Sequence, residues 1–132
     1  MAPAAADSIL SYLRLGSYSL DSIDLIVTGD LGIIGTRLLY DLMEKEGVSI
    51  EKKHADLGNL LYNTQKLDSH SGASGCGCSA SMLACHLLPS LERGDLSRVL
   101  FFSTGALMNT QSTLQKNNIL GVAHGILIER GV

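Results

Sequence analysis

Two almost continuously apolar segments mark the centre of the predicted fold. Residues 23–29 (IDLIVTG) and 98–103 (RVLFFS) lack the regular apolar–polar alternation of a half-exposed strand. They are typical of strands that are buried on both faces, as in parallel sheets. Residues 122–129 (VAHGILIE) predict a further strand, and a weaker one is predicted over 56–64, around Leu60 to Tyr62.

Apolar residues at helical spacing lie between these strands. A short helix is predicted over 8–15, and a longer one over 31–47, where Gly47 is the stop signal. A third helix is predicted from 78 to about 92, with Pro89 bending or ending its regular part. The polar residues 109–118 indicate a loop. The apolar stripe expected on the second helix consists of Ile34, Leu38, Leu39, Leu42 and Met43.

The order β-α-β-α-β-β predicts an α/β fold with a mostly parallel sheet of about four or five strands, covered by helices. Two long helices are too few to cover both faces of such a sheet. We therefore expect an apolar surface that a partner half covers, and association of the isolated chain into a homo-oligomer.

Composition narrows the class of protein. A chain of 132 residues with 45% hydrophobic content is long and apolar enough for one domain with a real core. Only 10 Lys and Arg residues, in no basic run, argue against nucleic acid as a partner. No apolar run is long enough to span a bilayer, and MAPAAADSIL lacks the features of a signal peptide, so we expect a cytoplasmic protein.

The cysteines favour packing over chemistry. An odd number, 3, argues against a disulfide framework. Cys76 and Cys78 are closer together than the ligands of a zinc knuckle, so we expect no metal and small buried thiols instead. We expect no cofactor.

The segment 71–81 (SGASGCGCSAS) is rich in glycine and small residues and runs directly into the third predicted helix. Such residues let another element or a ligand approach the main chain closely. The helix start that follows favours a carboxylate or similar anion. We expect a buried, closely packed turn at this point rather than a surface linker.

A nucleotide-binding interpretation competes for residues 28–35 (TGDLGIIG), which resemble a dinucleotide glycine motif, and for Tyr62 and Lys66, which have the spacing of a short-chain dehydrogenase. The physical argument is against it. A dinucleotide fold needs more strand–helix units than this pattern supplies, and Asp30 places negative charge where a pyrophosphate would bind.

The combination of DLIVTGDLGIIG, HSGASGCGCSAS, RVLFFSTGALM and GVAHGILIE resembles the stage V sporulation protein AD family, from about Ser17 to Glu129. The resemblance implies a thiolase-like fold and a part in moving dipicolinic acid into the forming spore. It implies that residues 1–132 form a single C-terminal half-domain, with 1–16 poorly matched and the N-terminal half absent.

The resemblance also implies where a ligand would bind. Asp30 lies in the first strand-to-helix loop, HSGAS resembles the thiolase segment GHPLGAS, and Thr104 stands near the place of a second thiolase cysteine. Neither Thr104 nor an ionised Asp30 is a good acid–base group, so we expect no catalytic residues. The candidate ligand site at the carboxyl ends of the strands is Asp30, Leu31, Gly32, His70, Ser71, Gly72, Ser74, Thr104, Gly105, Ala106 and Leu107.

Several of these residues have simpler interpretations. Asp30 is expected, more often than not, to cap the helix that begins near Leu31. His70 is as well explained by a surface turn as by a pocket. His54 is expected in an exposed loop, while His86 and His124 are expected to pack against apolar neighbours.

The leading hypothesis is a non-enzymatic sporulation protein that contributes to dipicolinic acid binding and uptake, a role connected with spore germination. Its implied partners are an N-terminal thiolase-like half and other stage V sporulation proteins, through which it would lie peripherally at the spore inner membrane. The alternative is a fragment of a thiolase- or ketoacyl-synthase-like acyltransferase acting on acyl-CoA. A nucleotide-binding module ranks third.

Overall fold

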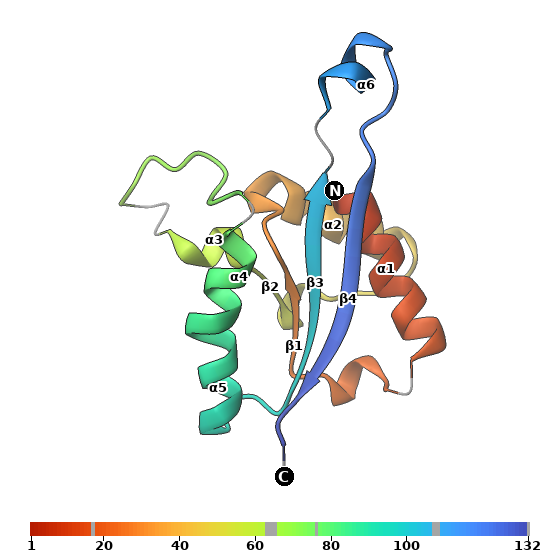
Figure 1. The fold of residues 1–132 in the computed structure, drawn as a ribbon. Helices are drawn as coiled ribbons and strands as arrows, with labels where there is room; N and C mark the ends of the chain where they lie inside the picture. Colours follow the sequence, from red (N-terminus) through yellow and green to blue (C-terminus); the bar gives the residue numbers. More distant parts are fainter. Residues whose placement is uncertain (17, 63–65, 76, 107–108, 132) are drawn as a thin grey trace.

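The strands form one open sheet in the order β2-β1-β3-β4 (Figure 1). The computed structural model describes residues 1–16, 18–62, 66–75, 77–106 and 109–131. β1 pairs in parallel with β2 and β3, and β4 pairs antiparallel with β3. This confirms the predicted α/β architecture with its mostly parallel sheet. The strands are β1 (Leu25–Thr28), β2 (His54–Asp56), β3 (Arg98–Ala106) and β4 (Gly121–Glu129).

Helices cover both faces of the sheet. A π-helical turn at Leu83–Leu87 joins α4 to α5, and short 3-10 turns lie at Leu20–Ser22 and Glu51–Lys53. Figure 1 shows a hairpin that extends beyond the sheet and carries α6 at its tip. The helices are α1 (Ala2–Leu15), α2 (Gly32–Lys45), α3 (Leu57–Leu61), α4 (Cys78–Met82), α5 (Leu88–Arg93) and α6 (Thr110–Leu114).

The strand residues alternate between two separate cores. Ile26, Leu100 and Phe102 pack with α1 and α2, while Val27 and Phe101 pack on the opposite face with α3 and the α4–α5 helix. Neighbouring residues of a strand point to opposite faces. β1 and the first half of β3 are therefore buried on both sides, as their apolar sequences predict.

The prediction of a strand over 56–64 is wrong. The strand β2 ends at Asp56, and Leu60 lies in α3. Asp56 accepts a hydrogen bond from the backbone N–H of Asn59, so it begins a helix at the point where the sequence pattern predicts a strand. Residues 63 and 64 lie outside the described residues.

Two further element boundaries differ from the prediction. The first helix begins at Ala2 rather than at residue 8, because Ala2, Ala5 and Ala6 bury their side chains in the core beside the sheet. The polar segment 109–118 contains the short helix α6, which begins where the Asn109 side chain accepts a hydrogen bond from the N–H of Gln111.

The expected apolar stripe on α2 is wider than the packed one. Leu39 and Met43 are fully buried, whereas Ile34 is 71% and Leu38 is 45% exposed. α1 packs against α2 on the same face of the sheet, and Leu42 packs against the core as a partly buried neighbour of Leu39 and Met43.

The helix predicted over 78–92 runs from Cys78 to Arg93 and packs on the sheet through Leu87 and Leu91. Pro89 does not end it. The turn before Pro89 widens to a π-helical turn, which accommodates a residue that has no N–H and whose ring crowds the preceding turn. The small residues at the start of this helix differ in burial: Cys78 is buried, whereas Gly77, Ala80, Ser81 and Ala84 are exposed. The turn at 71–81 is therefore not the buried one that the sequence predicts, since only Ala73 and Cys78 of its described residues are buried.

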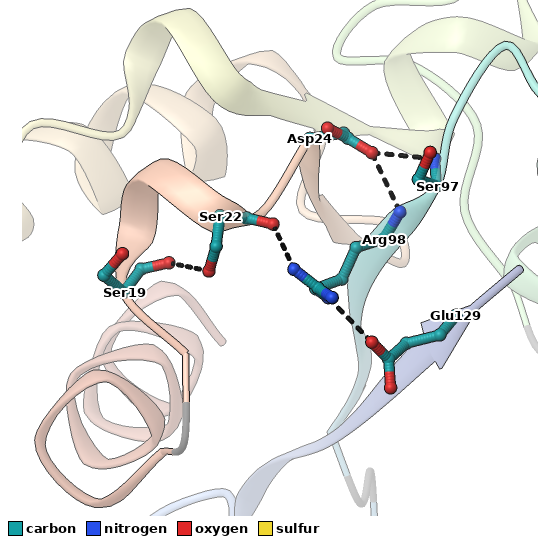
Figure 2. A network of polar contacts seen from close by, with 6 residues as sticks. All are labelled: Ser19, Ser22, Asp24, Ser97, Arg98 and Glu129. Carbon is teal, nitrogen blue, oxygen red and sulfur yellow. Dashed lines mark hydrogen bonds and ion pairs between the residues drawn. The ribbon is translucent and has the colours of Figure 1, made fainter.

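A polar network, here called the amino-end network, joins the segments at the amino ends of β1 and β3 (Figure 2). Asp24 accepts hydrogen bonds from the backbone N–H groups of Ser97 and Arg98, and these bonds lower the pKa of its carboxyl. The Arg98 guanidinium donates to Glu129 and to the carbonyl of Ser22, and it lies over the ring of Tyr18 at 4.0 Å. The network therefore fixes three chain segments to one another.

Candidate functional site

Asp30 lies at the meeting point of three loops at the carboxyl ends of the strands. Its Oδ1 accepts a hydrogen bond of 2.7 Å from the Thr104 hydroxyl, and its backbone N–H donates to the same hydroxyl. Its Oδ2 accepts from the Ser74 hydroxyl and from the N–H of Gly75. These contacts, here called the carboxyl-end site, hold the ends of β1 and β3 and the glycine-rich turn together.

Asp30 does not cap α2. The backbone N–H groups of Leu31 and Gly32, at the start of that helix, donate to the carboxylate of Asp56 instead. Asp56 also accepts from the Thr28 hydroxyl at 2.7 Å and from the N–H of Asn59. One buried carboxylate thus anchors the beginnings of α2 and α3, which leaves Asp30 free to face the neighbouring loops.

A hollow of about 660 Å³ opens beside Asp30. Ser79, Ser103 and Thr104 line it with hydroxyl groups. Phe101 and Leu83 form an apolar part of its wall. Open α/β sheets place their ligands at this edge, beyond the carboxyl ends of the strands. A carboxylate, several hydroxyls and an aromatic face can together orient a small planar molecule that carries polar groups.

The structure brings only part of the predicted ligand set together. Asp30, Ser74, Thr104, Gly105 and Ala106 line the hollow. Leu31, Gly32, His70, Ser71 and Gly72 are described in the structure but do not line it. Leu107 lies outside the described residues.

Leu31, Gly32, Ser71 and Gly72 shape the loops behind the hollow. Gly32 has a φ of +70°, a conformation that side chains resist, and a Cβ there would meet the Ser71 carbonyl. That carbonyl accepts the N–H of Ile33. The glycines of TGDLGIIG thus have local packing roles in this structure.

The expectations for the histidines are mostly wrong. His70 belongs to a surface turn, with its side chain 87% exposed beside Asp68. His86 and His124 are exposed and not packed, the latter because the α4–α5 helix leaves that part of β4 uncovered. His54 lies not in an exposed loop but in β2, where Thr28 and Tyr40 bind its two ring nitrogens. Burial lowers the pKa of His54 to about 4, although the charge of Asp56 opposes the change.

Cys78 fits the expectation that its small size matters more than reactivity. Burial, followed by the negative charges of Asp30 and Asp56, raises the pKa of its thiol, which disfavours the nucleophilic thiolate. Cys85 is exposed, and Cys76 lies outside the described residues.

Sequence reasoning missed Thr28, Tyr40, His54 and Asp56 as parts of the site's framework. Asp56 carried a usable signal, because an aspartate directly before an apolar segment is a common helix start. The interpretation of 56–64 as a strand hid it. Thr28 and His54 offered no signal, since their contact arises from the pairing of β1 with β2.

Two kinds of feature are absent from the described residues. None of the helices found there is long and apolar enough to cross a membrane. In the same part of the chain, no three His, Cys, Asp or Glu side chains gather as a metal ion would require.

The sequence of this chain is similar to those of known proteins. A family model described as stage V sporulation protein AD matches residues 1–129. The curated stage V sporulation protein AD of Bacillus subtilis (strain 168) is 39% identical over 130 residues, which covers 98% of this chain and 38% of the relative. The chain therefore spans well under half the length of that relative, and both matches include most of α1.

Proposed function

This chain belongs to the stage V sporulation protein AD family, and from that membership we propose that it contributes, without catalysis, to binding dipicolinic acid for uptake into the developing spore. The observation that carries the proposal is the convergence of three loops on Asp30 beside the hollow. The ligand would be an aromatic ring bearing two carboxylates.

The chemistry of the hollow supports such a ligand. Phe101 and Leu83 offer apolar contact to an aromatic ring, and the Ser79 hydroxyl can donate to a carboxylate. The charge of Asp30 opposes a dianion, but the Thr104 and Ser74 hydroxyls and one backbone N–H already donate to it. Those bonds spread its charge and lessen the repulsion.

Thr104 supports binding over catalysis. Its hydroxyl donates to Asp30 Oδ1 and accepts from the Asp30 N–H, so it joins two loops by two hydrogen bonds. A threonine is a weak nucleophile unless a base activates it. Its geometry suits a structural or ligand-donating hydroxyl.

The exposed side of the α4–α5 helix supports an N-terminal thiolase-like half as the partner. Small residues at 77, 80, 81 and 84 form a stripe at helical spacing that would let another helix approach closely. Val122 and Ile126 of β4 are 46% and 53% exposed nearby in the sheet. The proposed half would cover both surfaces.

The wider assembly is proposed on the family resemblance. Homo-oligomerisation, contact with other stage V sporulation proteins and peripheral attachment at the spore inner membrane from the cytoplasmic side belong to this proposal.

The test is calorimetric titration of dipicolinate into the complex of this chain with an N-terminal thiolase-like half supplied in trans. Ser74→Leu and Thr104→Val should each weaken binding by about tenfold or more, because each removes a hydroxyl that compensates Asp30. Ser97→Leu, an equally exposed serine at the opposite end of the sheet, should bind like the parent.

Folded Ser74→Leu and Thr104→Val variants that bind as tightly as the parent would overturn the site. Turnover of acetoacetyl-CoA with an acceptor, above background, would favour the acyltransferase alternative instead.

A further inference from the structure

A chain of side-chain hydrogen bonds runs behind the carboxyl-end site. The Tyr40 hydroxyl lies 3.0 Å from Nδ1 of His54, and Nε2 of His54 lies 3.0 Å from Oγ1 of Thr28. Thr28 in turn donates to Oδ2 of Asp56 at 2.7 Å. These hydrogen bonds join α2, β2 and β1, and the last of them is made to the carboxylate that holds the starts of α2 and α3.

The chemistry of the four groups determines which group donates and which accepts in each of these hydrogen bonds. A threonine hydroxyl has a single proton, and here it goes to the Asp56 carboxylate, which can only accept. Thr28 must therefore accept from His54, so Nε2 carries the ring proton. In neutral histidine Nδ1 is then an acceptor, and the Tyr40 hydroxyl donates to it.

The surroundings favour the neutral ring. Thr28 and Asp56 are buried, and Tyr40 packs edge-on against the imidazole with ring centroids 5.4 Å apart. The charges that act on this cluster come from Asp56 on β2 and from Glu51 before it, both acidic. Burial outweighs the attraction of Asp56 and keeps the pKa of His54 low.

Asp56 connects this hydrogen-bond network to the loop that carries Asp30. Its two oxygens accept the N–H groups of Leu31 and Gly32, the two residues directly after Asp30. On the other side of Asp30, the chain continues into Gly29 and Thr28. The loop is therefore held on both sides by members of one network.

We infer that Tyr40 and His54 are positioning residues, which orient Thr28 and Asp56 so that the Asp30 loop keeps its place beside the hollow. The inference goes beyond the proposed function and holds whatever ligand the hollow takes.

The test is nitrogen NMR of the imidazoles together with hydrogen exchange of the backbone amides, both on the 132-residue chain. At pH 7 His54 should show the neutral tautomer protonated at Nε2, and it should stay neutral well below the ordinary histidine pKa of 6.5. In Tyr40→Phe, exchange at the Leu31 and Gly32 amides should accelerate by about tenfold, the loss expected for one hydrogen bond.

Two controls separate positioning from general destabilisation. Tyr62→Phe removes a hydroxyl from a half-exposed tyrosine outside the network and should leave these amides unchanged. Thr28→Ser keeps the bridging hydroxyl and should behave like the parent, whereas Thr28→Val should not. An Nδ1-protonated tautomer, or unchanged Leu31 and Gly32 exchange in folded Tyr40→Phe, would overturn the inference.

Discussion

At each end of the sheet a carboxylate accepts backbone N–H groups from neighbouring segments, but the two carboxylates differ in burial. At the amino ends, the Asp24 carboxylate accepts two backbone N–H groups, and at the carboxyl ends the Asp56 carboxylate accepts three. Asp24 is exposed and lies beside the guanidinium of Arg98. Asp56 is 3% exposed, and the groups that donate to it among the described residues are all neutral.

The difference separates a solvent-screened network at the amino ends from a buried one beside the proposed ligand site. Solvent and salt screen the amino-end network, so it can join chain segments at little cost and contribute modestly. The carboxyl end instead places a buried carboxylate under a second, half-exposed one, Asp30, which borders the hollow. Buried polar networks of this kind are costly to disturb and hold a loop in one arrangement.

The largest difference in stability is expected when the carboxylate is removed at one end or at the other. Asp56→Ala should lower the free energy of unfolding by about 3–5 kcal/mol, because four donors lose a buried acceptor. Asp24→Ala should cost clearly less, since water can replace its carboxylate. Urea unfolding of both variants measures the difference, and equal losses would contradict the comparison.

The pH dependence of stability should arise at the carboxyl end. His54 has a pKa of about 4 in the folded chain and an ordinary value of 6.5, so the unfolded chain binds the extra proton as pH falls. Stability from this residue is full above pH 6.5 and is lost between pH 6.5 and 4, by about 3 kcal/mol. His54→Gln should flatten this part of the curve, whereas His70→Gln, at an exposed position, should not. A curve that His54→Gln leaves unchanged would contradict the burial argument.

Packing beside the carboxyl-end site should also tolerate change poorly, with a smaller loss of stability than the removal of Asp56. Cys78→Phe should cost about 1–3 kcal/mol by overpacking, because Cys78 is buried at the start of α4. Cys85→Phe makes the same change at an exposed position seven residues further along and should be close to neutral. If Cys78→Phe melts like the parent, residue 78 faces solvent and the placement of α4 is wrong.

The smallest effect is expected at the amino end. Glu129→Gln removes the partner of Arg98, a contact that raises the pKa of the guanidinium and is partly open to water. The variant should melt slightly below the parent at low ionic strength, and the gap should close in 1 M salt, where the Debye length is about 3 Å. A gap that persists at high salt would mean that the pair acts as a buried contact.

The sequence predicted the frame of the fold better than the detail of its site. The apolar runs at 23–29 and 98–103 specify buried strands, because burial on both faces demands continuous apolar residues. The convergence of the Asp30, Ser74 and Thr104 loops also follows from the strand order. The pattern of apolar and polar residues could not show which carboxylate caps α2. Asp56 reaches that helix only through the pairing of β1 with β2.

The central claim is that the carboxyl ends carry the ligand site and the amino ends do not. Amide shift mapping tests it directly, with dipicolinate added to the complex of this chain and an N-terminal half, and with only this chain isotope-labelled. We predict saturable shifts at Asp30, Gly75 and Thr104, with the amides of Ser97 and Arg98 unmoved. Shifts centred on Ser97 and Arg98, or none that saturate, would contradict the account.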